Sequence, residues 1–273
     1  MKAIMIELKS FLDRILKGDI RKLQFFIMAT ILLIGVIFRD FSLQLSQVIF
    51  TMISAYATQT IFGHFFNKKS NLPSALITSM GLSLLLRSDT LWIHPLAAFI
   101  AISSKFIIQW NGKHLFNPAM LGVIVSIYIF KSSWISPGQW GHDLSLGLWI
   151  LGFGYIISGR ADRRDISLSF VFFYVFFLLF RKVYYGFTFE VFIHQLSSGS
   201  LFLFAFFMIS DPRTTPNHIK GRWMHSFFVA LLAYFWQYHL FRQSSLIWSL
   251  FLLSPLVPIW DKIWEDKLYV WNQ

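Results

Sequence analysis

The 273-residue chain contains no cysteine and few acidic residues. Without cysteine, disulfides, thiolate metal sites and iron–sulfur clusters held by this chain are excluded. Only 13 residues are Asp or Glu against 24 Lys or Arg, and charged residues make up 14% of the sequence. Such a chain has too little polar surface to cover a soluble globule. The composition therefore predicts a membrane protein.

The sequence also lacks the motifs of soluble enzymes. It has no phosphate-binding loop, no Gly-rich dinucleotide turn, no zinc motif and no nucleophilic serine in its usual frame. Three glycines in one apolar segment, Gly147, Gly152 and Gly154, are predicted to allow close packing between helices.

Apolar segments recur along the whole chain, which is 56% hydrophobic and 19% aromatic. Several are shorter than the roughly 20 residues of a standard membrane crossing. We predict an all-α polytopic membrane protein with an N-terminal segment (1–22), an integral membrane domain (23–260) and a C-terminal tail (261–273). The ten predicted spans are residues 24–38, 43–63, 72–87, 92–109, 115–130, 144–158, 166–180, 189–209, 223–241 and 245–260.

The net charge of +11 is explained by the positions of the basic residues between these spans. With a cytoplasmic N-terminus, 17 of the 24 Lys and Arg residues lie inside and 6 outside, and Lys105 lies in the fourth span near its inner end. The positive-inside rule therefore places both termini in the cytoplasm. We therefore expect the chain to interact with the lipid bilayer and not to bind nucleic acid through these basic residues. Residues 1–22 are predicted to form an amphipathic helix on the inner leaflet and not a signal peptide.

Two distant apolar segments end alike, which suggests an internal repeat. The third span runs into Leu85-Leu86-Arg87-Ser88-Asp89-Thr90, and the eighth into Met208-Ile209-Ser210-Asp211-Pro212-Arg213-Thr214. An offset of five spans reverses orientation, so we predict two inverted five-helix halves, roughly 23–131 and 144–260. Chance similarity of short apolar strings is the alternative.

A polar stretch inside the apolar sequence, Gly112 to Met120, marks the candidate site. Pro118 lacks an N–H and has φ preset for a first helical turn, and Asn117 can cap the N–H groups that follow. Such a helix start can bind a ligand. The corresponding tenth span carries Pro255 and Pro258, and breaks in both helices would leave backbone groups to satisfy. Alternatively, these prolines only kink their helices.

The chain resembles the RnfD/NqrB family, the membrane subunits of ion-translocating, flavin-dependent electron-transfer complexes. The resemblance covers about residues 72 to 222, and its most specific parts are Phe116-Asn117-Pro118-Ala119-Met120 and the Asp211-Pro212 ending. Four stretches carry it in family order: Ser74-Ala75-Leu76-Ile77-Thr78; Lys105 with Asn117-Pro118-Ala119-Met120; Arg164-Asp165-Ile166-Ser167-Leu168-Ser169-Phe170; and Ser210-Asp211-Pro212 with Thr215 and Gly221-Arg222.

The chain departs from the family pattern on the outer side. The resemblance implies FMN bound covalently to a threonine after the fifth span, yet residues 117–187 contain no threonine. The outer segment offers Ser132, Ser133 and Ser136, without the motif around them. We therefore predict no covalent FMN.

The resemblance further implies a non-covalent flavin, riboflavin or FMN, near the helix that begins at Asn117-Pro118. An isoalloxazine ring needs flat apolar surfaces and a hydrogen-bonding edge. The alternative is that Asn117 only caps its helix, Asp211 only starts a turn before Pro212, and the aromatics form an interfacial belt. The candidate stacking residues are Phe116, Trp110 and Trp223, the candidate edge-binding residues are Asn117, Asn111 and Thr215, and Pro118, Asp211 and Lys105 complete the predicted site.

As the resemblance implies, the chain is expected to be a subunit of an Rnf/Nqr-type complex in a bacterial inner membrane, with the other subunits as partners. It would support electron transfer coupled to ion translocation, and whether it is catalytic alone stays open. No ionisable residue lies at the middle of a predicted span, so translocation by this chain alone has no support in the sequence. The alternative function is a transporter or channel for riboflavin or another small solute on the same scaffold.

Overall fold

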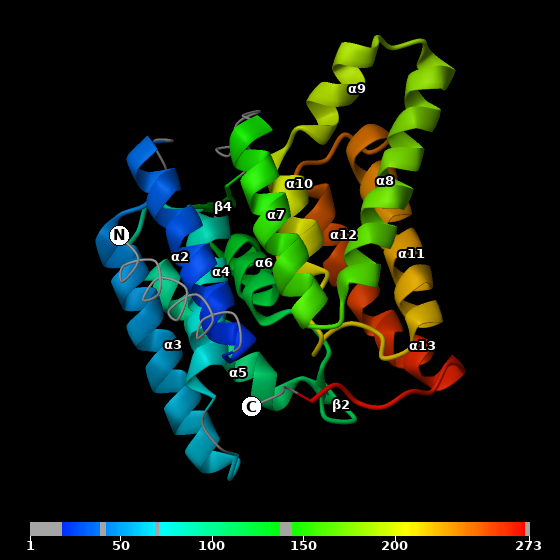
Figure 1. Ribbon diagram of the computed structural model, residues 1–273. Helices are drawn as coiled ribbons and strands as arrows, with labels where there is room; N and C mark the ends of the chain where they lie inside the picture. The colour runs from blue at the N-terminus through cyan, green and yellow to red at the C-terminus, as the bar shows by residue number, and fades with distance from the viewer. Residues whose placement is uncertain (1–17, 39–41, 69–70, 131, 137–143, 271–273) are drawn as a thin grey trace, which may run out of the picture.

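The computed structural model describes residues 18–38, 42–68, 71–130, 132–136 and 144–270. Most of the predicted amphipathic segment 1–22 lies outside these ranges. The described chain is mostly helical, and its helices lie side by side in a bundle (Figure 1).

The helices follow the apolar segments in order. They are α2 (Ile20–Phe38), α3 (Leu45–Phe65), α4 (Leu72–Leu85), α5 (Ile93–Ile107), α6 (Pro118–Ile129), α7 (Leu144–Arg160), α8 (Arg164–Tyr185), α9 (Phe189–Leu196), α10 (Gly199–Leu203), the π-helix η1 (Phe204–Met208), α11 (Ile219–Tyr238), α12 (Ser245–Leu253), the 3-10 turn η2 (Ser254–Leu256) and α13 (Val257–Ile263).

Within the described residues, three helices are long and apolar enough to cross a membrane. They are Ile20–Phe38, Arg164–Tyr185 and the broken helix Ser245–Ile263, and α9 with α10–η1 makes a fourth if that pair, bent by 47°, is one span. Helices α4, α5 and α6 are apolar but shorter. The architecture is that of a helical membrane protein, and ten crossings remain a prediction.

Several predicted boundaries were wrong, for identifiable reasons. The third predicted span, 72–87, ends as a helix at Leu85 because residues 86–88 form a strand. The fifth, 115–130, becomes helical at Pro118, where the Asn117-Pro118 pattern predicts the helix start. The eighth, 189–209, is divided at residues 197–198. The irregularity predicted at the prolines of the tenth span is present as the 3-10 turn η2, where the missing N–H of Pro255 interrupts the α-helical hydrogen bonding.

Two small antiparallel sheets lie at opposite ends of the bundle (Figure 1). At one end β1 (Leu86–Ser88) pairs with β4 (Ser133–Ile135). At the other, β2 (Gln109–Trp110) and β3 (Lys113–His114) form a hairpin. Its two-residue turn, Asn111-Gly112, has positive φ at both positions, 46° and 77°. This is the turn chemistry that two-residue hairpins favour, and it fixes the approach of the chain to α6.

Glycines allow close helix contacts at some positions but not at all that were predicted. A Cβ on Gly154 of α7 would collide with the Cβ of Phe206 in η1. A Cβ on Gly147 would meet only the ring of Phe202 at ordinary contact distance, and one on Gly152 would meet nothing within 4 Å. The prediction of close packing is confirmed for Gly154 and wrong for Gly152.

Candidate functional site

A cavity of about 460 Å³ lies where α4 and α6 begin. One side is formed by residues of α2, α3 and α5, and the other by residues of α7, α10, η1 and the loop of residues 209–218 that follows η1. The volume is within the usual range for small-molecule sites. Its lining extends to the exposed residues Lys68, Gly112 and Val270, so the cavity reaches the surface.

Two helices begin at this cavity with the same local chemistry. The Asn71 side chain caps α4 by accepting a hydrogen bond from the N–H of Ser74 at 3.3 Å. The Asn117 side chain caps α6 in the same way, from the N–H of Met120 at 3.2 Å. Each cap is followed by a proline in the first turn. The positive ends of two helix dipoles therefore meet at one cavity.

Lys105 holds the end of α5 against the beginning of α4. Its Nζ donates to both the carbonyl oxygen and the Oγ of Ser74, each at 3.1 Å. The side chain is buried and lines the cavity. Both acceptors are uncharged oxygens of the same residue.

Asp211 lies opposite, at the start of the 209–218 loop. Its Oδ2 accepts a hydrogen bond from Nδ2 of Asn117 at 3.3 Å, and its Oδ1 accepts one from the N–H of Arg213 at 3.0 Å. Burial raises the pKa of the Asp211 carboxyl, although the N–H of Arg213 and the charge of Lys105 oppose the shift. The structure thus brings together Asn117 and Asp211, which the sequence places 94 residues apart.

Arg213 ties the 209–218 loop to two other segments at the cavity wall. Its Nη2 donates to the carbonyl oxygen of Gly112 at 2.6 Å, and its Nη1 to that of Tyr269 at 3.2 Å. Tyr269 belongs to the extended C-terminal segment, residues 264–270, whose Val270 also lines the cavity. The hairpin, the loop and the C-terminal segment are joined here by one guanidinium group.

Two further polar side chains at the cavity have unpaired atoms. Gln59 of α3 is 4% exposed, and its Oε1 has no hydrogen-bond partner. Nδ1 of His114 is also buried without a partner. Burial, with the nearby charge of Lys105, lowers the pKa of His114 to about 3, so its ring is neutral at physiological pH. Buried polar atoms are normally satisfied, so these atoms indicate contact with water or a ligand.

Five predicted site residues do not line this cavity. Trp223, a predicted stacking residue, is 45% exposed on α11. Trp110 is 57% exposed on the hairpin, and Asn111 occupies the hairpin turn. Phe116 stacks on Phe251 of α12 with ring centroids 5.0 Å apart. The Oγ1 of Thr215 accepts a hydrogen bond from Nε of Arg163 at 3.1 Å. Of the predicted set, Asn117, Pro118, Lys105 and Asp211 line the cavity.

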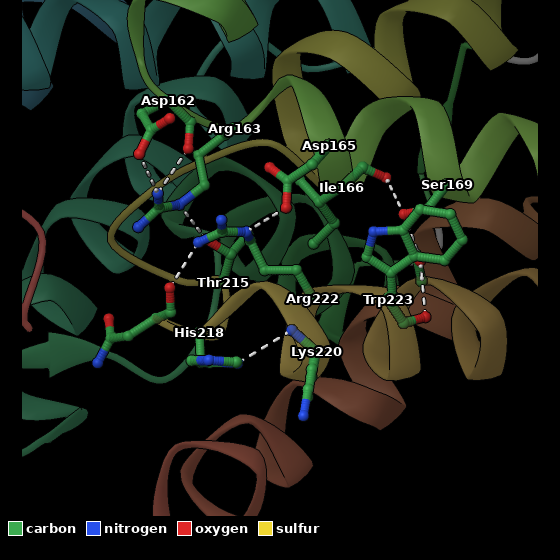
Figure 2. A network of polar contacts seen from close by, with 12 residues as sticks. Asp162, Arg163, Asp165, Ile166, Ser169, Thr215, His218, Lys220, Arg222 and Trp223 are labelled. Atoms are coloured by element: carbon green, nitrogen blue, oxygen red, sulfur yellow. Dashed lines mark hydrogen bonds and ion pairs between the residues drawn. The ribbon is translucent and has the colours of Figure 1, made fainter. Parts of the chain in front are cut away.

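Thr215 belongs instead to a polar network that fixes the 209–218 loop against the turn between α7 and α8 (Figure 2). Arg222 at the start of α11 binds Oδ2 of Asp165 at 2.5 Å. One helical turn further along, the hydroxyls of Ser169 (labelled in Figure 2) and Ser226 lie 2.7 Å apart between α8 and α11. These contacts position the loop without reaching the cavity.

A second cluster of polar contacts, around Lys113, joins the hairpin to α13. Nζ of Lys113 donates to Oδ2 of Asp261 at 2.6 Å, to Oδ1 of Asn217 at 3.2 Å and to the carbonyl oxygen of Thr215. Burial lowers the pKa of Lys113, while its bond to Asp261 opposes the shift. The 209–218 loop is therefore held from both sides.

Three of the four stretches that carried the family resemblance converge on the cavity. Its lining includes Ser74 and Thr78, then Lys105, Asn117 and Ala119, and finally Ser210, Asp211 and Pro212. The remaining stretch, 164–170, forms the α8 side of the network in Figure 2.

Sequence reasoning missed Asn71, Arg213 and Gln59 as cavity residues. A signal existed for Asn71, because Asn71-Leu72-Pro73 repeats the pattern of Asn117-Pro118 before an apolar run. Gln59 lies inside a helix with no distinctive neighbours, so only the fold reveals it.

The three serines of the predicted outer segment, Ser132, Ser133 and Ser136, lie within the described residues. The hydroxyl of Ser133 donates to the carbonyl oxygens of Ser126 and Phe130, at 3.0 and 2.8 Å, and Ser136 is buried with its N–H bound to the carbonyl oxygen of Leu85 at 2.8 Å. Residues 131 and 137–143 of the same segment lie outside the described ranges.

Known proteins resemble this chain over a large part of its length. The profile of the NQR2, RnfD, RnfE family matches residues 133–269. A curated relative from Pseudomonas paraeruginosa, which is a component of an ion-translocating oxidoreductase complex, is 24% identical over 258 residues, an alignment that covers 72% of this chain and 74% of that protein.

Proposed function

Because the chain belongs to the NQR2, RnfD, RnfE family, we propose that it is a membrane subunit of an ion-translocating oxidoreductase complex and holds a non-covalent flavin in the cavity at the starts of α4 and α6. The single observation that carries the flavin proposal is the convergence on one cavity of three separate family-like stretches. A bound flavin supplies electron transfer; the residues of this chain bind it, orient it and limit its contact with water.

The cavity wall has both kinds of surface that a flavin needs. Phe106 of α5 and Phe207 of η1 line it and offer aromatic surface, in place of the predicted Trp110 and Phe116. Asn117 and Gln59 offer amide groups to the polar edge of a ring. Asn117 is held by its cap to Met120 and by Asp211, so its amide has a fixed position.

We also propose the inverted repeat of two five-helix halves, in a bacterial inner membrane with both termini in the cytoplasm. Equivalent helices have equivalent neighbours: α3 packs on α5 as α8 packs on α11, and α5 packs on α6 as α11 packs on α12. The cavity lies between α4 and the α10–η1 helix, the third elements of the two halves. Binding sites between inverted repeats are a common arrangement in membrane proteins.

The experiment compares two substitutions of Asn117 in the purified full chain. Asn117→Leu removes both the helix cap and the amide, whereas Asn117→Ser keeps a good cap and removes only the amide. Flavin released by denaturation should be abundant from the wild-type protein and nearly absent from both variants. If the Ser variant retained its flavin, Asn117 would act only as a cap; flavin-free wild-type protein would refute the cofactor itself.

The second candidate function is a transporter or channel for riboflavin or another small solute. The observation that favours it is the absence of threonine from residues 117–187, which removes the usual attachment point of the outer flavin. Proteoliposomes that contain only this chain should take up labelled riboflavin if this alternative holds. Uptake no faster than in empty liposomes would exclude riboflavin transport by the chain alone.

A further inference from the structure

One face of α8 carries a row of large apolar side chains that are exposed. The row consists of Leu168, Phe172, Phe176 and Phe180, each between 46% and 61% exposed. Residues four apart lie on the same side of an α-helix. Because α8 is one of the three described helices that are long and apolar enough to cross a membrane, this face is suited to contact with lipid chains.

Arg164 lies at the end of this row. It is the first residue of α8 and comes four residues before Leu168, so it continues the lipid-facing side of the helix. A long basic side chain at the end of a membrane helix reaches the level of the lipid headgroups. The positive-inside pattern predicts that this end of α8 is cytoplasmic, and anionic lipids give the cytoplasmic surface of a membrane a negative potential.

Two residues of α7 hold the guanidinium group of Arg164 in place. Its Cζ lies 4.0 Å from the centroid of the Tyr155 ring, a cation–π contact. One helical turn further along α7, Gly159 leaves the space that the guanidinium group needs, because Nη2 of Arg164 occupies the position where a Cβ would lie. The group is therefore fixed before any ligand binds, unlike that of an ordinary surface arginine.

The charge of Arg164 has no anionic partner within the described residues. Its Nε is buried without a hydrogen-bond acceptor. The two carboxylates of the same turn are engaged elsewhere: Asp165 binds Arg222 at 2.5 Å, and Asp162 lies 3.9 Å from Arg163. A fixed, partly buried guanidinium group with unused donors favours an anion beside it.

A second arginine without an anionic partner lies at the same turn. Arg160, the last residue of α7, donates from Nη2 to the carbonyl oxygen of Gly18 at 2.8 Å, and its Nη1 is buried without a partner. It forms no ion pair with any residue that the structure describes. Arg160 follows Gly159, against which the guanidinium group of Arg164 lies. The turn thus offers donors from two arginines, the residue type that suits phosphate recognition.

From these contacts we infer that the turn between α7 and α8 binds the phosphate group of an anionic phospholipid, with Arg164 and Arg160 as donors and the lipid chains along the Leu168–Phe180 face of α8. The continuity of the arginines with an exposed apolar row favours a phospholipid over a free phosphate ion, which would use the arginines alone. The inference goes beyond the proposed function and does not depend on the ligand of the cavity.

The first test compares lipids on the unmodified protein. The full chain, purified in detergent and freed of lipid, is titrated with phosphatidylglycerol, with phosphatidylcholine and with inorganic phosphate, and bound molecules are counted by native mass spectrometry. We expect phosphatidylglycerol to bind roughly tenfold more tightly than phosphatidylcholine, and inorganic phosphate not to bind measurably. Equal affinity for the two lipids, or phosphate bound as tightly as phosphatidylglycerol, would overturn the inference.

The second test separates a fixed site from simple charge attraction. Arg164→Gln should weaken phosphatidylglycerol binding roughly tenfold. Gly159→Ala keeps both arginines but displaces the guanidinium group of Arg164, so it should weaken binding by a similar factor. Arg242→Gln is the matched control, because Arg242 is exposed in the loop between α11 and α12.

Thermal unfolding in lipid-free detergent shows whether each variant is folded at the temperature of the titration. Should Gly159→Ala prove unfolded there, Tyr155→Leu replaces it, since that substitution removes the ring beneath the guanidinium group. A loss in Arg164→Gln no greater than in Arg242→Gln would overturn the site. Wild-type affinity in a folded Gly159→Ala or Tyr155→Leu variant would likewise show that no preformed site exists.

Discussion

Replacement of Lys113 by Met should loosen the wall of the cavity without touching its lining. Lys113 lies on the hairpin strand β3, and its Nζ binds Asp261 of α13 as well as Thr215 and Asn217 of the 209–218 loop. The substitution keeps the length and the apolar stem of the side chain but leaves Oδ2 of Asp261 without its cation.

The expected cost follows from burial. The Lys113 side chain is 6% exposed and that of Asp261 is 18% exposed. Removal of one partner of a buried ion pair costs about 3–5 kcal/mol. Asp261 retains the N–H of Asn217 at 2.7 Å and some contact with water, so we expect the lower end, about 3 kcal/mol. At roughly 2–4 °C per kcal/mol, the midpoint of thermal unfolding should fall by roughly 6–12 °C.

The assay is thermal unfolding of the purified protein in detergent, followed by intrinsic tryptophan fluorescence. Lys262→Met is the control, because Lys262 is the next residue after Asp261 and is exposed. The double variant Lys113→Met with Asp261→Asn should be clearly more stable than the sum of the two single effects predicts, since no charge is then left unpaired. Additive single effects, or a shift of Lys113→Met no larger than that of the control, would refute this account of the ion pair.

Three further outcomes are expected. Gly154→Ala should destabilise the protein by about 1–3 kcal/mol, because the added Cβ would collide with Phe206. Gly152→Ala on the same helix should be neutral or slightly stabilising. Equal unfolding midpoints for the two variants would contradict the α7–η1 contact. The pKa of His114 is about 3 in the folded chain, below its ordinary value of 6.5. The neutral ring therefore makes its full contribution to folding stability above pH 6.5, and this contribution is lost as the pH falls toward 3. The unfolding midpoint should therefore decrease between pH 7 and pH 5, and less in His114→Asn than in the wild type; parallel pH profiles would disprove the role of this ring. Mass spectrometry of the denatured chain should show no flavin adduct on the outer serines, and an FMN phosphoester on Ser133 would contradict the bonding of its hydroxyl to Ser126 and Phe130.

Local chemistry made the main helices and one helix start predictable. An Asn followed by a proline before an apolar run predicted the cap of α6, and the structure confirms it through the bond from Met120 to Asn117. Hydropathy placed the centres of the helices but not their ends. The strand at Leu86–Ser88 escaped detection because its partner, Ser133–Ile135, lies 45 residues further along the chain and continues a similarly apolar sequence.

The site was predictable only where polar residues interrupt apolar sequence. Asn117, Lys105 and Asp211 stand out in this way, and all three line the cavity. Trp110 was expected beside Asn117 because the two are close in sequence, but the turn at Asn111-Gly112 reverses the chain between them and leaves Trp110 exposed. Gln59 could not be found, since its relevance depends on the packing of α3 against α4 and α5.

The order in which the chain is synthesised limits when a cofactor can be loaded. The cavity wall draws on residues from both ends of the described chain, including Arg21 of α2 and Val270 of the C-terminal segment, and Arg213 is held by Tyr269. A ribosome therefore exposes the starts of α4 and α6 long before the segment that completes the wall. Cofactor insertion is expected to follow translation, and a bulky fusion placed directly after Val270 should reduce cofactor occupancy more than the amount of protein in the membrane.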